Sequence, residues 1–228
     1  MGEQRAPRHL DFDIGRSLVY EDRDLLVVSK PAGLLTVDDD RGSPNLYSIL
    51  QRYEIESGRK DPRLFLVHRL DRDTSGLLVF ARTARVREVL QRCFEENAVE
   101  RRYEAVVTDW NLPVNKTLRC PINLEQDSKG NIRVVPEGRG KPCLTYITCL
   151  YKGQSRSYLD ISLVTGRRNQ IRLTLKALGS PIVGDTKYGG VKNSRMMLNA
   201  YRLCFPEGIG LKRTEFEIER IFSRGFNI

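Results

Sequence analysis

The sequence predicts an α+β fold built on one large, mixed, mostly antiparallel β-sheet with flanking helices. Short apolar runs rich in β-branched and aromatic residues follow one another through the middle of the chain, and turn-forming clusters separate them. Helical spacing of apolar residues occurs in only three segments, without a regular alternation of strand and helix. Strands joined by tight turns pair as antiparallel hairpins, so we expect the sheet to be mostly antiparallel.

The first predicted strand and helix lie near the N-terminus. The apolar run Leu25–Val28 predicts a buried strand, and the turn Lys30-Pro31-Ala32-Gly33 ends it without need of a ligand. Ser43-Pro44 combines a capping residue with a proline at the first helical position, so we expect a helix to open there. Its apolar face consists of four residues at helical spacing: Leu46, Ile49, Leu50 and Tyr53.

A second strand and helix follow along the chain. The run Gly76–Ala81 predicts a buried strand, and the hydroxyl of Thr83 can cap the helix that comes next. The apolar face of this helix consists of Val86, Val89, Leu90, Cys93 and Phe94.

The remainder of the chain is dominated by predicted strands. We expect them at residues 103–108, 122–124, 132–135, 144–151 and 157–164, with turn clusters at residues 127–131 and 152–155 that favour hairpins. A third helix presents Ile171, Thr174, Leu175 and Leu178 and ends at Gly179. A last strand is expected at residues 197–203.

The chain is expected to form one catalytic domain over residues 19–228, preceded by an N-terminal extension over residues 1–18. No internal repeat, low-complexity tract or Pro/Ser-rich linker divides it. The length of 228 residues permits either one large domain or two small ones.

The composition indicates a globular protein of a reducing compartment. Hydrophobic residues make up 40% of the chain, no apolar run is long enough to span a bilayer, and the N-terminus lacks a signal-peptide pattern. The five cysteines contain no C-x-x-C pair and only two histidines accompany them, so we expect free thiols and no metal site. We therefore expect a cytoplasmic protein.

The charge of the chain indicates a polyanionic partner. The formal net charge is +9, and 28 of the 38 basic residues are arginines. Arginine binds phosphate with two parallel hydrogen bonds and stacks on bases, which suits a folded nucleic acid. The alternative is a basic protein whose arginines are merely solvated.

A charged loop from His68 to Ser75, between two apolar runs, is the first candidate site. Loops that a rigid scaffold supports commonly carry functional side chains. Asp71 stands between Arg69 and Arg72, and these cations favour an ionised carboxylate suited to nucleophilic or electrostatic work.

The same loop allows other interpretations. A turn in which Asp73 and its neighbours bond to the local backbone would need no function. Asp71 and Asp73 would suit a Mg²⁺-dependent nuclease, although no further acidic cluster supports it, and a glycosidase would need a second carboxylate in a different environment. His68 is a candidate general base, but a single histidine before a charged turn is more often structural.

The segment Thr165–Arg172 is the second candidate site, at the junction of a predicted strand and the third predicted helix. The backbone N–H groups of a helix start, together with Arg167, Arg168 and Arg172, would bind an anion. A phosphate or a catalytic carboxylate is therefore expected there, and the alternative is a solvated basic helix end. Tyr103 follows two arginines at a strand start, where it could stack on a base, accept a proton or simply belong to the core.

These segments, in this order, resemble the RluA family of RNA pseudouridine synthases over roughly residues 19–205. Lys30-Pro31-Ala32-Gly33 resembles the opening turn of the family. His68-Arg69-Leu70-Asp71 with Thr74-Ser75-Gly76 resembles its H-R-L-D-x-x-T-S-G motif. Thr165-Gly166-Arg167 with Gln170-Ile171-Arg172 resembles T-G-R-x-x-Q-I-R, and Pro181–Gly189 completes the order.

The resemblance implies the pseudouridine synthase catalytic fold and an isomerase that converts uridine in RNA to pseudouridine without a metal or small-molecule cofactor. It implies that Asp71 is the catalytic aspartate, that Arg172 pairs with it and that Tyr103 is the active-site tyrosine. Arg69 would fill the stack that the target base leaves. The other cations of the two candidate sites, Arg72, Arg167 and Arg168, would bind the RNA.

The resemblance leaves the substrate open between ribosomal and transfer RNA. Two positions depart from the family pattern, since Asn169 and Asn199 stand where it has histidines, and we expect these changes to affect substrate contacts rather than the chemistry of Asp71. No S4 RNA-binding domain precedes Tyr20, so the catalytic domain is expected to bind RNA alone, as a monomer, or with the help of a partner. The alternative is a catalytically silent RNA-binding or assembly module on the same fold.

Overall fold

The computed structural model describes residues 12–39 and 42–226, and residues 1–11 of the predicted N-terminal extension lie outside this range. The helices are α1 (Ile14–Ser17), α2 (Leu46–Glu56), α3 (Ala84–Glu95) and α4 (Gln170–Ala177), with 3₁₀ turns η1 (Thr186–Tyr188) and η2 (Ser223–Phe226). The strands are β1 (Leu18–Glu21), β2 (Leu25–Lys30), β3 (Phe65–Leu66), β4 (Ser75–Ala81), β5 (Glu100–Val107), β6 (Thr117–Gln126), β7 (Ile132–Val135), β8 (Lys141–Lys152), β9 (Ser157–Leu163), β10 (Leu198–Cys204) and β11 (Glu215–Glu217).

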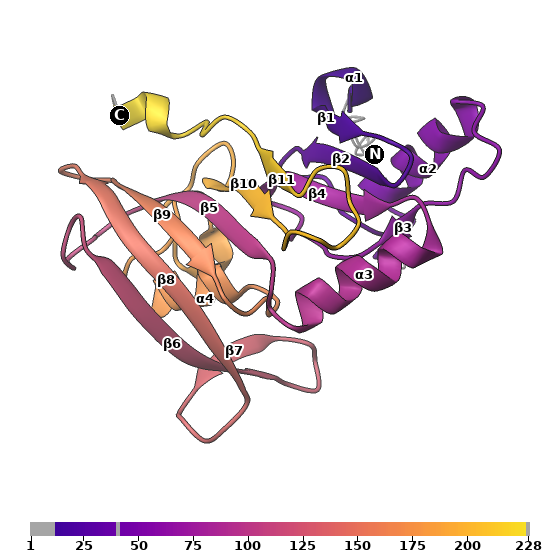
Figure 1. Ribbon diagram of the computed structural model, residues 1–228. Helices are drawn as coiled ribbons and strands as arrows, with labels where there is room; N and C mark the ends of the chain where they lie inside the picture. Colours follow the sequence, from indigo (N-terminus) through magenta and orange to yellow (C-terminus); the bar gives the residue numbers. More distant parts are fainter. Residues whose placement is uncertain (1–11, 40–41, 227–228) are drawn as a thin grey trace, which may run out of the picture.

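These eleven strands form one sheet in the order β1-β2-β4-β10-β5-β9-β8-β6-β7, with β3 beside β4 and β11 beside β10 (Figure 1). Every pair is antiparallel except β10 with β4, which is parallel. The predicted mixed, mostly antiparallel sheet with flanking helices is confirmed. The two hairpins expected from the turn clusters are also present, as β6–β7 and β8–β9.

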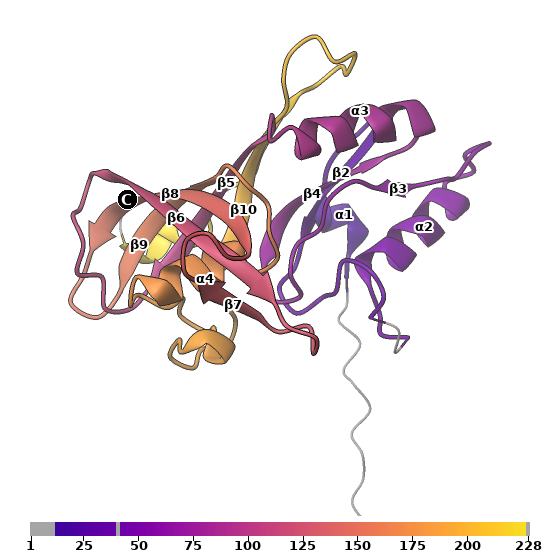
Figure 2. The same cartoon turned by 90° about the horizontal axis from the view of Figure 1, so that it is seen from below.

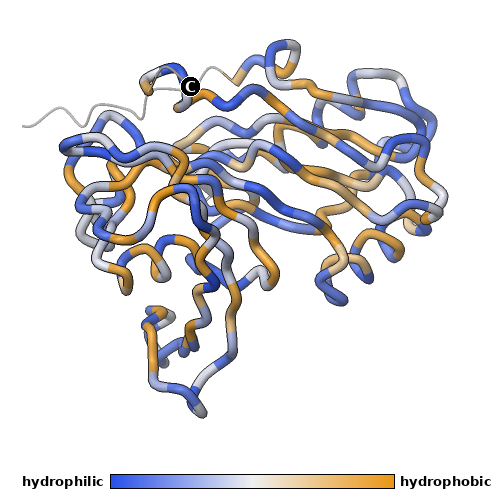
Figure 3. The backbone as a smooth tube through the Cα atoms, turned by 60° about the vertical axis from the view of Figure 1, so that its left-hand side comes forward, coloured by the Kyte–Doolittle hydropathy of each residue, from blue (hydrophilic) through white to orange (hydrophobic). Residues whose placement is uncertain are grey.

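Helices cover both faces of the sheet (Figure 2). Alternate residues of β2 point to opposite faces, so Leu26 and Val28 belong to the core that also contains residues of α2 and α4, whereas Leu25 and Val27 belong to the core that contains residues of α3. Because both faces are buried, β2 and β4 are continuously apolar instead of alternating. Figure 3 shows hydrophobic and hydrophilic stretches following one another along the strands and loops of the chain.

The start of α2 differs from the prediction. The residue that caps the helix is Asn45, whose Oδ1 accepts a hydrogen bond from the Ser48 amide at 2.9 Å. The first helical residue is therefore Leu46 and not Pro44. Asn45 is extended and forms a bridge with Leu35, so Ser43-Pro44 lies before the helix and does not open it. The cap predicted for α3 is confirmed, since the Thr83 hydroxyl accepts from the Val86 amide.

Six short elements have no counterpart in the prediction: α1, β1, β3, β11 and the 3₁₀ turns η1 and η2. Each has two to four residues, too few to show a periodic pattern. Within residues 12–39 and 42–226, no helix has both the length and the apolar character needed to cross a membrane.

The edge of β4 explains where a site forms. β3 pairs with the end of β4 at Phe80 and Ala81, whereas β10 pairs with its beginning at Ser75 and Gly76. The chain between β3 and β4 therefore forms a loop over residues 67–74, which lines one cavity together with Leu198 of β10 and Arg101 and Tyr103 of β5.

Candidate functional site

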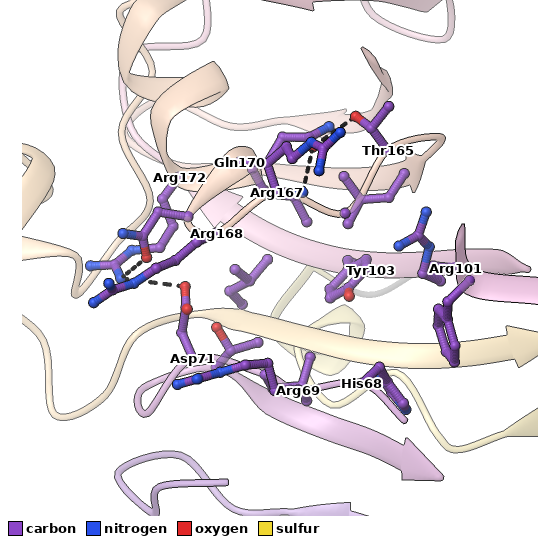
Figure 4. A pocket seen from close by; sticks show the side chains of 18 of the residues that line it. His68, Arg69, Asp71, Arg101, Tyr103, Thr165, Arg167, Arg168, Gln170 and Arg172 are labelled. Atoms are coloured by element: carbon purple, nitrogen blue, oxygen red, sulfur yellow. Dashed lines mark hydrogen bonds and ion pairs between the residues drawn. The ribbon is translucent and has the colours of Figure 1, made fainter. Parts of the chain in front are cut away.

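A cavity of about 610 Å³ lies beside the 67–74 loop, a volume in the usual range for ligand sites. The 67–74 loop forms one wall, residues 163–170 with the start of α4 form the other, and β5 contributes side chains between them (Figure 4). Six of the seven residues predicted for the site line this cavity: Asp71, Tyr103, Arg172, Arg69, Arg167 and Arg168. Arg72 does not line it, although it lies in the same loop.

His68 supports the 67–74 loop rather than presenting a free nitrogen. Its Nε2 accepts a hydrogen bond from the Val79 amide of β4 at 3.0 Å, so the side chain replaces a strand carbonyl at this edge. The ring stacks on Phe94 of α3 with centroids 4.6 Å apart. Burial, with a smaller contribution from the charge of Arg101, lowers the pKa of His68 to about 3. His68 is therefore neutral at physiological pH, and the nitrogen that a general base would use is already engaged.

Lys30 ties the turn after β2 to the loop that carries Asp71, a role that the sequence pattern missed. Its Nζ is buried and donates to the carbonyl oxygens of Pro31, Leu34 and Arg72 at 2.7 to 2.9 Å. Burial lowers the pKa of Lys30 to about 7, against the opposing charges of nearby carboxylates. A lysine at the end of an otherwise apolar strand was the available signal, because a lysine is rarely fully buried without a specific partner.

Arg72 completes this connection. Its Nε donates to the Gly33 carbonyl at 3.0 Å, and its own carbonyl accepts from the Gly33 amide at 2.9 Å. The side chain stays exposed and turns away from the cavity toward the turn after β2.

The end of the 67–74 loop is held against β10. Gly76 has a φ of +114°, and a Cβ at this position would lie 2.1 Å from the Ala200 carbonyl oxygen, so only glycine permits this close approach. Next to it, the Ser75 hydroxyl donates to Asn199 Oδ1 at 2.7 Å, and the Asn199 amide donates to Glu104 at 2.8 Å. Asn199 is thus buried among protein groups and does not line the cavity.

The opposite wall is shaped by residues before α4. Gln170 Oε1 accepts from the Thr165 hydroxyl and from the Arg167 amide at 2.8 and 3.1 Å, which closes the loop before the helix. Asn169 has a left-handed backbone with φ of +58°, a conformation that asparagine tolerates better than most residues. Its side chain donates to the Tyr188 hydroxyl and accepts from Arg172 Nη1, both at 3.0 Å. Asn169 therefore contacts the arginine that faces Asp71.

Arg172 lies between two carboxylates. Its Nε and Nη2 donate to Asp185 at 2.7 and 2.8 Å, and its Nη1 lies 3.6 Å from Asp71 Oδ2. Burial alone lowers the pKa of Arg172, but the hydrogen bonds and charge of Asp185 and the charge of Asp71 outweigh it, so the pKa is raised. The anion expected near the helix start is thus supplied by carboxylates of the protein. Asp185 holds one edge of the guanidinium and leaves the other turned toward Asp71, which is a quarter exposed.

Tyr103 lies between the two walls, with its ring at the bottom of the cavity (Figure 4). Burial raises the pKa of its hydroxyl, the charge of Arg101 opposes this and the charge of Asp71 adds to it. The phenol therefore remains protonated at physiological pH, and the side chain offers a flat, mostly apolar surface beside Asp71.

Exposed cations surround the entrance of the cavity. Arg69 extends from one wall, and Arg167 and Arg168 extend from the other. Within the described part of the chain, none of these three forms an ion pair with a carboxylate. They remain free to bind a polyanion.

The interpretation of Asp71 and Asp73 as metal ligands has little geometric support. Asp73 is exposed and does not line the cavity. Among residues 12–39 and 42–226, no three His, Cys, Asp or Glu side chains gather in an arrangement that could hold a metal ion.

Comparison with known proteins relates this geometry to a family. Residues 24–177 match the family model described as RNA pseudouridylate synthase. "Ribosomal large subunit pseudouridine synthase D" of Zymomonas mobilis is 30% identical over 91% of this chain and 70% of that protein. The protein of the same name from Yersinia pestis is 35% identical over 81% of this chain and 55% of that protein.

The fold has a close counterpart among solved structures. The human RNA pseudouridylate synthase domain containing 4 superposes with a TM-score of 0.75 at 22% identity, over 94% of this chain and 93% of that one. The expected pseudouridine synthase fold is therefore confirmed. Together with the family match over residues 24–177 and the relatives at 30% identity or more, the fold shows that this chain belongs to the RNA pseudouridylate synthase family, whose enzymes isomerise uridines of RNA.

Proposed function

We propose that this chain isomerises uridines of ribosomal RNA to pseudouridine, with Asp71 as the catalytic carboxylate. The observation that carries the proposal is the contact of 3.6 Å between Asp71 and Arg172, in a cavity that Tyr103 also lines. The names of the bacterial relatives refer to the large ribosomal subunit, which supports ribosomal RNA as the substrate.

The reaction requires a carboxylate in this position. The N-glycosidic bond between N1 and C1′ breaks, the uracil turns and C5 bonds to C1′. The proton on C5 leaves and N1 takes up a proton, so uridine and pseudouridine remain isomers. Positive charge develops on the sugar when the base departs, and an anionic side chain stabilises it or attacks C1′ directly. Asp71 supplies that anion, and Arg172, itself held by Asp185, orients it.

The exposed cations fit the binding of a folded RNA. The target uridine must leave its base stack to reach a recessed carboxylate, at a cost of a few kcal/mol. Arg69 at the entrance is placed to enter the stack, and Tyr103 receives the base on its ring. Arg167 and Arg168, with Arg72 outside the cavity, bind phosphates of the backbone. The protein acts as a monomer in the cytoplasm.

The test is the release of tritium from transcripts of large-subunit ribosomal RNA and of transfer RNA labelled with [5-³H]uridine. The wild-type protein releases tritium from the ribosomal transcript, and mass spectrometry of the digested RNA detects pseudouridine. Asp71→Asn lowers the rate by at least about 10³-fold, because the amide carries no charge. Retention of the RNA on a filter changes less than about threefold, because Asp71 does not bind the backbone.

Asp73→Asn is the matched control, since this carboxylate lies two residues away in the same loop but is exposed and outside the cavity. It keeps wild-type activity. Release that persists in Asp71→Asn would remove Asp71 from its role. A wild-type protein that retains RNA without releasing tritium would instead be a silent RNA-binding module, and activity on transfer RNA alone would overturn the choice of substrate.

A further inference from the structure

Arg101 is a buried cation of the cavity that the proposed reaction does not use. Residues 101 and 103 are two apart on β5, so their side chains point to the same face, and both line the cavity. Arg101 is only 6% exposed. Its position beside Tyr103 follows from strand geometry and not from any turn or loop.

Arg101 differs from the other buried arginines in its partners. Arg82 pairs with Glu54 and Glu21, and Arg172 pairs with Asp185, as buried cations usually do. Arg101 Nη2 donates only to the Val164 carbonyl, at 2.6 Å. Within the described residues its Nε has no hydrogen-bond partner, and no carboxylate lies within ion-pair distance of its guanidinium.

Gly166 holds the Arg101 guanidinium in this place. A Cβ on Gly166 would lie 2.3 Å from Arg101 Nη1, so the arginine lies directly against the backbone of the opposite wall. Burial lowers the pKa of Arg101, since no carboxylate compensates for the loss of solvent. The guanidinium donates a hydrogen bond only to the Val164 carbonyl and lies over the Phe94 ring, 5.9 Å from the ring centroid, and its Nε has no hydrogen-bond partner within the described residues. A buried charged donor with unused hydrogen-bonding capacity fits an electron-rich oxygen that arrives with the substrate.

The order of side chains in the cavity indicates which oxygen this is. Tyr103 lies between Asp71 and Arg101 in Figure 4, and its hydroxyl interacts electrostatically with both charges. A uridine whose sugar faces Asp71 and whose base covers Tyr103 directs the far edge of the base toward Arg101. That edge carries the O4 oxygen in uracil and an amino group in cytosine. An arginine has only donors, so it donates a hydrogen bond to O4 of uracil and is repelled by the amino group of cytosine.

We propose that Arg101 donates a hydrogen bond to O4 of the target base and thereby selects uracil over cytosine. This placement of the nucleotide rests on the proposed function, in which Asp71 faces the sugar. Arg101 is then a specificity-determining residue. A hydrogen bond from a charged donor that is only 6% exposed corresponds to a preference of at least about tenfold.

The test compares the binding of two fluorescent RNA oligonucleotides, U12 and C12, by anisotropy. The wild-type protein binds U12 at least about tenfold more tightly than C12. Arg101→Met weakens the binding of U12 and leaves the binding of C12 nearly unchanged, so the two affinities come to within about twofold of each other. Arg101→Lys keeps a donor and retains part of the preference. Gly166→Ala keeps the charge but displaces the guanidinium, so it also lowers the ratio.

Arg63→Met is the matched control, because Arg63 is exposed, is bonded to Asp61 and does not line the cavity. It leaves the ratio of U12 to C12 unchanged. Equal binding of both oligonucleotides by the wild-type protein overturns the proposal. If Arg101→Met weakens the binding of U12 and C12 equally, the proposal is also overturned, and Arg101 would instead bind a phosphate. If Arg101→Met does not fold, Arg101→Lys and Gly166→Ala decide the question.

The binding test is independent of turnover. A wild-type protein that releases no tritium but prefers U12 in an Arg101-dependent manner would contradict the proposed function and leave this inference standing. An active enzyme whose preference for U12 survives in Arg101→Met would support the proposed function and contradict the role of Arg101.

Discussion

His68 acts as a neutral hydrogen-bond acceptor and not as an acid or base. Its Nε2 must be unprotonated to accept the hydrogen bond from the Val79 amide, and its ring is packed against Phe94. Both conditions favour the neutral form, in agreement with a pKa of about 3. A protonated His68 would lose its hydrogen bond and bring a second cation next to Arg101.

The contribution of His68 to stability therefore depends on pH. An unfolded histidine binds a proton below about pH 6.5, whereas the folded one resists it down to about pH 3. The stabilisation is complete above pH 6.5 and is lost as the pH falls between these values, by up to about 1.4 kcal/mol per unit. Urea unfolding at pH 7.5, 6 and 5 measures it.

His68→Gln isolates this effect, because glutamine can accept the same hydrogen bond but does not titrate. We expect the unfolding free energy of the wild type to fall steadily relative to that of His68→Gln from pH 6.5 to pH 5. A difference that stays constant over this range would show that His68 is not held neutral.

At the scale of elements, the turn after β2 and the loop before β4 behave as one unit. Lys30 and Arg72 are 42 residues apart, and the bonds of Lys30 and Gly33 to Arg72 join the two segments. The loop on which Asp71 lies is thus fixed by the strand next to it as well as by its own turn.

Lys30→Met tests this connection. The apolar side chain fills a similar volume but leaves the carbonyls of Pro31, Leu34 and Arg72 without their shared donor. We expect the unfolding free energy to fall by about 1 to 3 kcal/mol, and the rate of tritium release to fall because the Asp71 loop loses its support. Urea denaturation and the release assay measure the two effects.

Lys60→Met serves for comparison, since Lys60 is exposed. It should alter neither quantity by more than about 0.5 kcal/mol or twofold. If Lys30→Met is as stable and as active as Lys60→Met, the link between the turn and the loop does not position the site.

At the scale of the whole molecule, Glu104 joins the C-terminal segment to the middle of the sheet. It lies on β5 next to Tyr103 but points to the opposite face, where it is fully buried. Its carboxylate accepts hydrogen bonds from the Tyr158 hydroxyl, the Asn199 side chain and the amides of Ile221 and Phe222. The last residues of the fold therefore cover the strand that carries Tyr103.

Glu104→Gln replaces one acceptor oxygen with an amino group that faces donors. We expect a loss of about 2 to 3 kcal/mol, or a decrease in Tm of about 4 to 10 °C for a chain of this size. Glu100→Gln, on the same strand but partly exposed, should lower Tm by less than about 2 °C. Equal Tm values for the two variants in a thermal scan would show that Glu104 does not anchor the C-terminal segment.

The sequence by itself determined most of the longer elements and predicted the residues of the candidate site. Alternating and continuous apolar runs marked β5 to β9 and the face of α3, because periodicity records which side of an element is buried. Asp71 and Arg172 were predicted in a different way, because each lies in a motif that resembles one of the RluA family.

Only the tertiary structure decided what each buried group contacts. Periodicity does not show that β10 lies parallel to β4, that Asp185 holds Arg172, or that Arg101 lacks a carboxylate. Such contacts join residues far apart in the chain, and their energies depend on burial and distance, which no local pattern contains. The sequence therefore predicted Asp71 as the carboxylate of the candidate site, whereas the packing of distant strands and loops decided which charges surround it.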